Sequence, residues 1–134
     1  MSSPSLEEVV TGLEEQTWKA LSEEGSKLLP FLSDDCIMLF PLGLKVSNTS
    51  KPSLEDILLS ESFVPWLRYE MRDVEVSELG RDGALITYAV TAFRPPLEGD
   101  DEVEFRALCA TAWKLDEDKQ RLVLCFHQQT PYQL

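Results

Sequence analysis

The sequence predicts an α+β domain in which helices pack on one side of a curved antiparallel sheet. Two observations predict this fold class. Apolar residues recur at helical spacing in the N-terminal part, whereas long strand-like segments with turn signals between them follow Pro65. The chain has 134 residues, the length of one domain, so we expect a single domain over residues 1–134.

A capped helix is expected near the start of the chain. Ser5 followed by Glu8 is a capping-box pattern, and the apolar spacing after it predicts a helix over about 5–22. A short second helix is expected over 26–32, with Pro30 near its end or at a kink.

The middle of the chain predicts short elements. The run over 36–40 is typical of a short buried strand, which ends at the proline that follows it. Residues 44–52 resemble a loop with room for a brief strand. Ser53 with Asp56 three residues later predicts a capped helix over 54–59.

Four long strands are expected in the rest of the chain, over about 65–79, 84–94, 102–115 and 120–129. A slip in the apolar alternation of the first of them predicts a β-bulge near Arg72 and Asp73. Since consecutive strands joined by turns pair in order, the four should form an antiparallel meander.

The last hairpin has an expected register. If its turn is centred on residues 117–118, Trp113 pairs with Leu122 and Thr111 with Leu124. One face of the hairpin is then bulky, and the other carries smaller side chains together with His127. The bulky face would contain Cys109, Thr111, Trp113, Leu122, Leu124, Phe126 and Gln128.

Both faces of these strands are apolar at mid-strand, although the expected helices can cover only one. A second copy of the chain is the simplest cover for the other face. The small residues Ala110 and Ala112 would let two sheets approach closely. We therefore expect a homodimer.

Charge and targeting signals exclude several classes of partner. The chain carries 24 Asp and Glu against 12 Lys and Arg, a formal net charge of −12, which repels phosphate backbones and anionic lipid. We expect no nucleic-acid partner and no membrane partner. The N-terminus lacks a signal-peptide pattern, and the three cysteines lack CxxC spacing, so we expect free thiols and a cytoplasmic location.

The order of elements resembles a known superfamily. A capped helix and a short helix precede residues 32–35, which lead into a strand, residues 41–43 form a Pro-Leu-Gly turn, and four long strands close with Phe-His-Gln-Gln-Thr-Pro over 126–131. This arrangement resembles the nuclear transport factor 2-like superfamily, the cone-shaped α+β barrel of ketosteroid isomerases and SnoaL-like cyclases. Residues 88–92 and 106–113 look like a branch of unknown function within it.

The resemblance implies a pocket between the helices and the concave sheet face, dimerisation through the convex face, and no cofactor. It implies no single activity, because a fold does not determine function.

The isomerases place a carboxylate just before the Pro-x-Gly turn, where this chain has Phe40, which cannot abstract a proton. Dehydratases with two catalytic histidines do not fit a chain with one. The Asp-Arg-Asp cluster of epoxide hydrolases does not fit Arg68, Arg72 and Asp73, which lie on one strand and cannot all converge.

Three residues are candidate acids or bases. His127 could act as a general acid or base near neutral pH, or serve as a structural hydrogen-bonding residue. Tyr69 and Tyr88 could offer phenolic donors inside a pocket, or direct their hydroxyls to solvent. Gln128 could orient a ligand carbonyl, or satisfy backbone groups at the end of the sheet.

The expected ligand-binding residues are mostly aromatic: Phe40, Trp66, Tyr69, Tyr88, Trp113, Phe126 and Gln128. Core packing is the alternative for the tryptophans. We expect no metal site, because one histidine and scattered cysteines do not supply the ligands of zinc. The sequence therefore leaves three functions open. The first is an apolar pocket that binds a small hydrophobic molecule, the second is a SnoaL-like isomerase, cyclase or dehydratase, and the third is a protein-interaction module.

Overall fold

The computed structural model describes residues 4–96 and 98–133. Two α-helices, α1 (Leu6–Leu21) and α2 (Leu54–Leu58), accompany two 3-10 helices, η1 (Gly25–Phe31) and η2 (Pro41–Gly43). The strands are β1 (Leu32–Phe40), β2 (Leu44–Ser47), β3 (Arg68–Leu79), β4 (Gly83–Arg94), β5 (Val103–Asp116) and β6 (Arg121–Pro131). The predicted α+β class is confirmed, and most predicted elements lie within a few residues of the observed ones.

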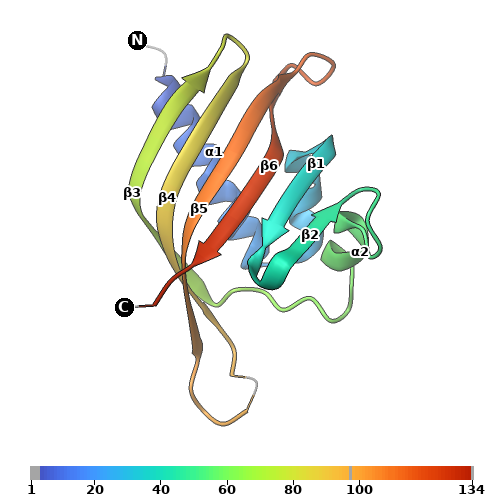
Figure 1. Cartoon of the computed structure of the whole chain (residues 1–134), viewed down its shortest axis with the longest axis vertical. Helices are drawn as coiled ribbons and strands as arrows, with labels where there is room; N and C mark the ends of the chain where they lie inside the picture. Colours follow the sequence, from blue (N-terminus) through green and yellow to red (C-terminus); the bar gives the residue numbers. More distant parts are fainter. Residues whose placement is uncertain (1–3, 97, 134) are drawn as a thin grey trace.

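The six strands form one curved sheet in the order β2-β1-β6-β5-β4-β3. Strands β3 to β6 are the predicted antiparallel meander. The sheet is mixed, because β1 joins it parallel to β6, a pairing that the sequence did not indicate. In Figure 1, α1 crosses behind β3 to β6, while β1, β2 and α2 lie together at the other side of the molecule.

Both predicted helix caps are present. The Ser5 hydroxyl accepts a hydrogen bond from the backbone N–H of Glu8 at the start of α1. Ser53 and Asp56 form a complete capping box at the start of α2. These caps fix where α1 and α2 begin.

The predicted β-bulge in β3 is also confirmed. The register between β3 and β4 shifts between Arg72 and Glu75, and Asp73 has a φ of 55°, in the left-handed region. The extra residue changes the phase of the side chains, so that both Met71 and Val76 pack against the core.

The predicted register of the last hairpin is wrong. Trp113 pairs with Leu124 rather than with Leu122, and Ala112 pairs with Phe126. Cys125 is therefore an additional residue, and its thiol donates to the Ala112 carbonyl at 3.4 Å. This second bulge brings His127 opposite Thr111, on the same face of the sheet.

The helix-covered face of the sheet, called the concave face below, carries the main core, with Trp18, Ile86, Trp113 and Leu124 fully buried. The opposite, convex face includes Leu108, which is 56% exposed. None of the helices in the described part of the chain is long and apolar enough to cross a bilayer.

Candidate functional site

A cavity of about 750 Å³ lies between the concave face and the helices beside it. Its walls come from the C-terminal half of α1, from η1, β1 and α2, from the segment after α2, and from β6. Most of the lining is apolar, with Leu28, Met38 and Phe63 among its side chains. A space of this size and character is typical of small-molecule sites.

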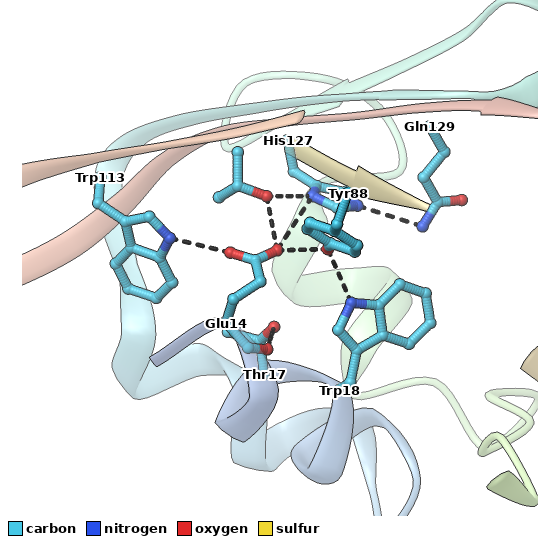
Figure 2. A network of polar contacts seen from close by, with 8 residues as sticks. Glu14, Thr17, Trp18, Tyr88, Trp113, His127 and Gln129 are labelled. Carbon is cyan, nitrogen blue, oxygen red and sulfur yellow. Dashed lines mark hydrogen bonds and ion pairs between the residues drawn. The ribbon is translucent and has the colours of Figure 1, made fainter. Parts of the chain in front are cut away.

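A buried carboxylate lies beside this cavity. Glu14 projects from α1 with its side chain fully buried. It accepts hydrogen bonds from the Tyr88 hydroxyl at 2.5 Å, the Thr111 hydroxyl at 2.6 Å and the Trp113 indole N–H at 2.9 Å. The donors come from β4 and β5, and Figure 2 shows Tyr88 and Trp113 reaching Glu14 from above the helix that carries it. Three donors satisfy a carboxylate that would otherwise be costly to bury.

The network continues from Glu14 to the cavity wall. Thr111 Oγ1 lies 2.7 Å from Nδ1 of His127, and Nε2 of His127 lies 3.2 Å from Nε2 of Gln129. His127 and Gln129 both line the cavity, whereas Glu14 and Thr111 do not. The polar chain therefore runs from inside the core to the cavity surface.

Proton positions in this chain follow from the donor inventory. The Gln129 nitrogen can only donate, so Nε2 of His127 accepts and the proton of the neutral ring sits on Nδ1. That proton is donated to Thr111 Oγ1, whose own hydrogen is donated to Glu14. With the side chains so oriented, the imidazole is neutral and Glu14 is ionised.

Burial shifts the pKa values of the network. Desolvation raises the pKa of Glu14, while the hydrogen bonds from Thr111, Tyr88 and Trp113 lower it and partly offset that rise. Desolvation also lowers the pKa of His127 from 6.5 to about 4, so the ring is neutral at physiological pH. The pKa of the Tyr88 phenol is raised well above its ordinary value, chiefly by burial, so it remains a donor.

A positive charge lies in another part of the cavity lining. The Arg94 guanidinium stacks 4.1 Å from the centre of the Trp66 ring, which in turn packs against Phe105. No ion pair of Arg94 is found within the described residues. This group can therefore receive an anionic or carbonyl oxygen of a ligand.

The predicted site residues separate into three groups. Phe40, Trp66 and His127 line the cavity. Tyr88 and Trp113 lie in the buried network instead, and Tyr69 packs on Trp18 at the outer side of α1, where its hydroxyl donates to the Glu15 carbonyl at 3.3 Å.

The third group is a correction. Phe126 and Gln128 were expected to face the cavity, but the bulge at Cys125 turns both toward the convex face. Gln128 lies there in a separate hollow of about 460 Å³ with Leu108 and Ala110. Gln129 faces the cavity in its place. The physical reason is the one-residue change of phase, which reverses every side chain after it.

Sequence reasoning missed Glu14, Thr111 and Gln129 as parts of the site. Acidic residues of a helix usually lie on its solvated face. Glu14 nevertheless lies four residues after Val10 and four before Trp18, on the buried stripe of the helix. An acidic residue on such a stripe signals a partner inside the core, and this signal was available in the sequence.

The described part of the chain holds no group of three or more His, Cys, Asp and Glu side chains arranged to bind a metal ion. The three cysteines are free, and burial raises the pKa of the Cys36 and Cys109 thiols to about 12. These thiols are therefore protonated and weakly nucleophilic.

Comparison with known proteins identifies the fold. No family model matches the sequence, and no curated protein matches it. A solved structure of an NTF2-like protein from Cytophaga hutchinsonii superposes with a TM-score of 0.75, at 16% identity, over 96% of this chain and 100% of that one. This chain has the nuclear transport factor 2-like fold.

Two further structures with this fold carry different names. The association domain of CaMKII from C. elegans has a TM-score of 0.67 at 13% identity, covering 91% of this chain and 92% of that one. LinA has a TM-score of 0.73 at 8% identity, covering 92% and 84%. These superpositions establish the shared nuclear transport factor 2-like fold. Because the sequence identities are low, activity has to be argued from the site.

Proposed function

We propose that this chain binds a small, mainly apolar molecule with at least one polar group in the cavity beside α1. The observation that carries the proposal is the cavity of about 750 Å³, whose mostly apolar walls include the polar groups of His127 and Gln129. Side chains of the core fill the neighbouring space, so this volume is not explained by poor packing of the whole domain.

The polar groups of the cavity indicate the chemistry of the ligand. Nε2 of His127 and the Gln129 amide can bond a hydroxyl or a carbonyl. Arg94, elsewhere in the lining, can bond an oxygen that carries negative charge. Apolar alcohols, ketones and monocarboxylates therefore form the first set of ligands to test.

Two variants of neighbouring β1 residues test this proposal. Met38→Trp enlarges a side chain in the cavity lining and should fill part of the space. Ile37→Trp makes the same kind of change one residue away, on the convex face, where Ile37 pairs with Phe126. Both proteins should be screened by thermal shift against those ligands, with native mass spectrometry of the purified protein to detect a retained molecule.

We expect one ligand class to raise Tm in the natural protein and in Ile37→Trp but not in Met38→Trp. At a ligand concentration of 100 times Kd, the added stability is about 2.7 kcal/mol. Equal shifts in the two variants would place binding outside the cavity. No shift by any ligand, together with no retained molecule, would contradict the proposal.

A second candidate function is an acid–base enzyme of the isomerase, cyclase or dehydratase type. One observation favours it: a neutral imidazole on the cavity wall, joined through Thr111 to a buried carboxylate, is arranged to accept a proton. Deuterium exchange into apolar ketones in D2O, followed by mass spectrometry, tests it. We expect exchange that is lost in His127→Gln; exchange that survives in the variant would remove His127 from this role.

We also propose that two copies of the chain associate through the convex face. Leu108 is 56% exposed there, and Ala110 and Ala112 next to it on β5 are only partly buried. The similarity to an association domain supports assembly of this kind. Leu108→Glu should yield a monomer in light scattering, whereas Leu79→Glu, at a similarly exposed leucine near the β3–β4 turn, should not. A natural protein that is monomeric at micromolar concentration would contradict this.

We further propose a cytoplasmic location and an interaction with a basic partner protein. The net charge of −12 favours a basic partner.

A further inference from the structure

The network of Figure 2 can hold its hydrogens in two ways. In the first, Glu14 is ionised and accepts from Thr111, which accepts from Nδ1 of His127, as the donor inventory requires for the present side-chain orientations. Nε2 of the ring then carries no proton. It presents an acceptor toward Gln129 and the cavity.

The second arrangement reverses the direction of every bond between Glu14 and His127. A protonated Glu14 donates to Thr111 Oγ1, and the Thr111 hydroxyl donates to Nδ1 of His127, over the same 2.6 Å and 2.7 Å separations. Nε2 then carries the ring proton and donates to the Gln129 amide oxygen after that amide rotates. Tyr88 and Trp113 remain donors to Glu14, so no buried group loses its partner.

The two arrangements differ by one proton. When a proton reaches Nε2, the Nδ1 proton moves to Thr111 and the Thr111 proton moves to Glu14. The ring begins and ends neutral, and the negative charge of the carboxylate is removed. A buried site favours this outcome because neither end state contains a buried imidazolium ion.

We propose that Glu14, Thr111 and His127 form a one-proton relay that switches Nε2 of His127, on the cavity wall, between a hydrogen-bond acceptor and a donor. The relay makes the cavity a site for ligands whose polar group is a hydroxyl or a carbonyl. A hydroxyl donor binds best when Glu14 is ionised, and a carbonyl acceptor binds best when Glu14 is protonated. This extension to ligands rests on the proposed binding function, whereas the relay itself does not.

The other titratable groups near Glu14 keep their protonation state as the pH falls, so the relay is the group that takes up the proton. Tyr88 on β4 and Cys109 on β5 face it, and burial raises the pKa of both, so they stay neutral. His127 on β6 resists protonation because burial lowers its pKa to about 4. The charged side chains of the cavity lining, Asp56, Arg94 and Glu104, make no hydrogen bond or ion pair with the relay within the described residues.

The single histidine of the chain makes the test direct. Long-range ¹H–¹⁵N spectra of the unliganded protein labelled at histidine report the tautomer without any assignment problem. As the pH falls we expect the ring to stay neutral while its proton moves from Nδ1 to Nε2 at one midpoint. That midpoint lies above the ordinary 4.5 of a glutamate, since burial raises the pKa of Glu14. An imidazolium signal that forms near 6.5, or a proton that stays on Nδ1 throughout, would overturn the relay.

Three variants separate the relay from a simple structural network. Glu14→Gln places an amide donor opposite Thr111, so the proton should stay on Nε2 at every pH. Thr111→Val removes the bridging hydroxyl and should abolish the tautomer change. Trp113→Phe removes a donor to the carboxylate but keeps the bridge, so the change should persist with a higher midpoint.

A tautomer change that survives in Thr111→Val at the natural midpoint would overturn the relay, because the ring would then sense Glu14 directly across 3.8 Å. If Thr111→Val does not fold, the locked tautomer of Glu14→Gln decides. These spectra require no ligand. Their failure is therefore distinguishable from failure of the ligand screen.

Discussion

The two halves of α1 face different interiors. The N-terminal half, around Val10, lies in a filled core with Ile86 and Val90 of β4. The C-terminal half, from Thr17 to Leu21, borders the cavity. One helix therefore contributes both to the stability of the domain and to its candidate site, and Glu14 lies at the boundary.

This difference shows which part of the molecule can change at low cost. A filled core loses both transfer energy and contacts when a side chain is truncated. A cavity wall already faces empty space on one side, so it has fewer contacts to lose. The predictions below test this contrast, from the largest expected effect to the smallest.

Truncating one isoleucine in the filled core and one in the cavity lining should give the largest difference in the free energy of unfolding. Ile86→Ala in the filled core, where Ile86 is 0% exposed, should lower the free energy of unfolding by about 2–5 kcal/mol. Ile57→Ala in the cavity lining makes the same chemical change at a partly buried residue, and we expect a loss below about 1.5 kcal/mol. Urea denaturation measures both, and equal losses would show that the two interiors are packed alike.

Acidification should destabilise the protein through His127. Its folded pKa of about 4 lies below the unfolded value of 6.5, so the stability from the neutral ring is fully present above 6.5 and is lost as pH falls toward 4. A shift of this size corresponds to about 3 kcal/mol. Urea unfolding at a series of pH values measures the loss.

The control for the pH prediction is His127→Gln. In this variant the free energy of unfolding should lack the part of its pH dependence that comes from the histidine. Glu14 acts with the opposite sign, because its raised pKa means that protonation on acidification favours the folded state. Glu14 is joined to His127 through Thr111, so the difference between the two curves reports the histidine together with its effect on Glu14. Parallel curves would show that His127 is accessible to water in the folded state.

Removing the cap of α2 should have a smaller effect. Ser53→Ala deletes the hydroxyl that accepts from the Asp56 N–H, at a cost of about 1 kcal/mol. Because α2 forms one wall of the cavity, we also expect weaker ligand binding. Ser77→Ala, at an exposed serine of β3 outside the cavity lining, should change neither quantity. Unequal binding without a stability change would mean that the cap acts on the site alone.

The smallest effect is expected at an exposed ion pair. Lys114 and Asp35 lie 2.9 Å apart with side chains that are 44% and 70% exposed, so Lys114→Met should cost less than about 0.5 kcal/mol. Thermal unfolding at low and high salt measures this. A larger loss at low salt would indicate a network of charges around β1 and β5.

Local signals in the sequence predicted most of the fold. The caps at Ser5 and Ser53 and the bulge at Asp73 follow from patterns within a few residues, and all three are present. The parallel pairing of β1 with β6 was not predicted, because no local pattern states which strands meet across about ninety residues of chain.

The candidate site was harder to predict. His127 was identified as a candidate, yet its partners were not. The bulge at Cys125 does not interrupt the apolar alternation, because this strand is apolar on both faces, so the sequence gives no sign of it. Glu14 was overlooked because an acidic residue on a helix is usually solvated. The donors from β4 and β5 explain how the carboxylate can occupy its interior position.

The bulge at Cys125 also shows which property of the sequence places His127 in the interior. Leu124 and His127 reach the same interior because one residue is added between the pairs Trp113–Leu124 and Ala112–Phe126. The position of the imidazole is thus specified by the number of residues in β6 rather than by their identity. Deleting Cys125 would leave every other amino acid in place and still turn His127 outward. A one-residue deletion in this strand would therefore remove the polar centre from the interior, as replacement of His127 would.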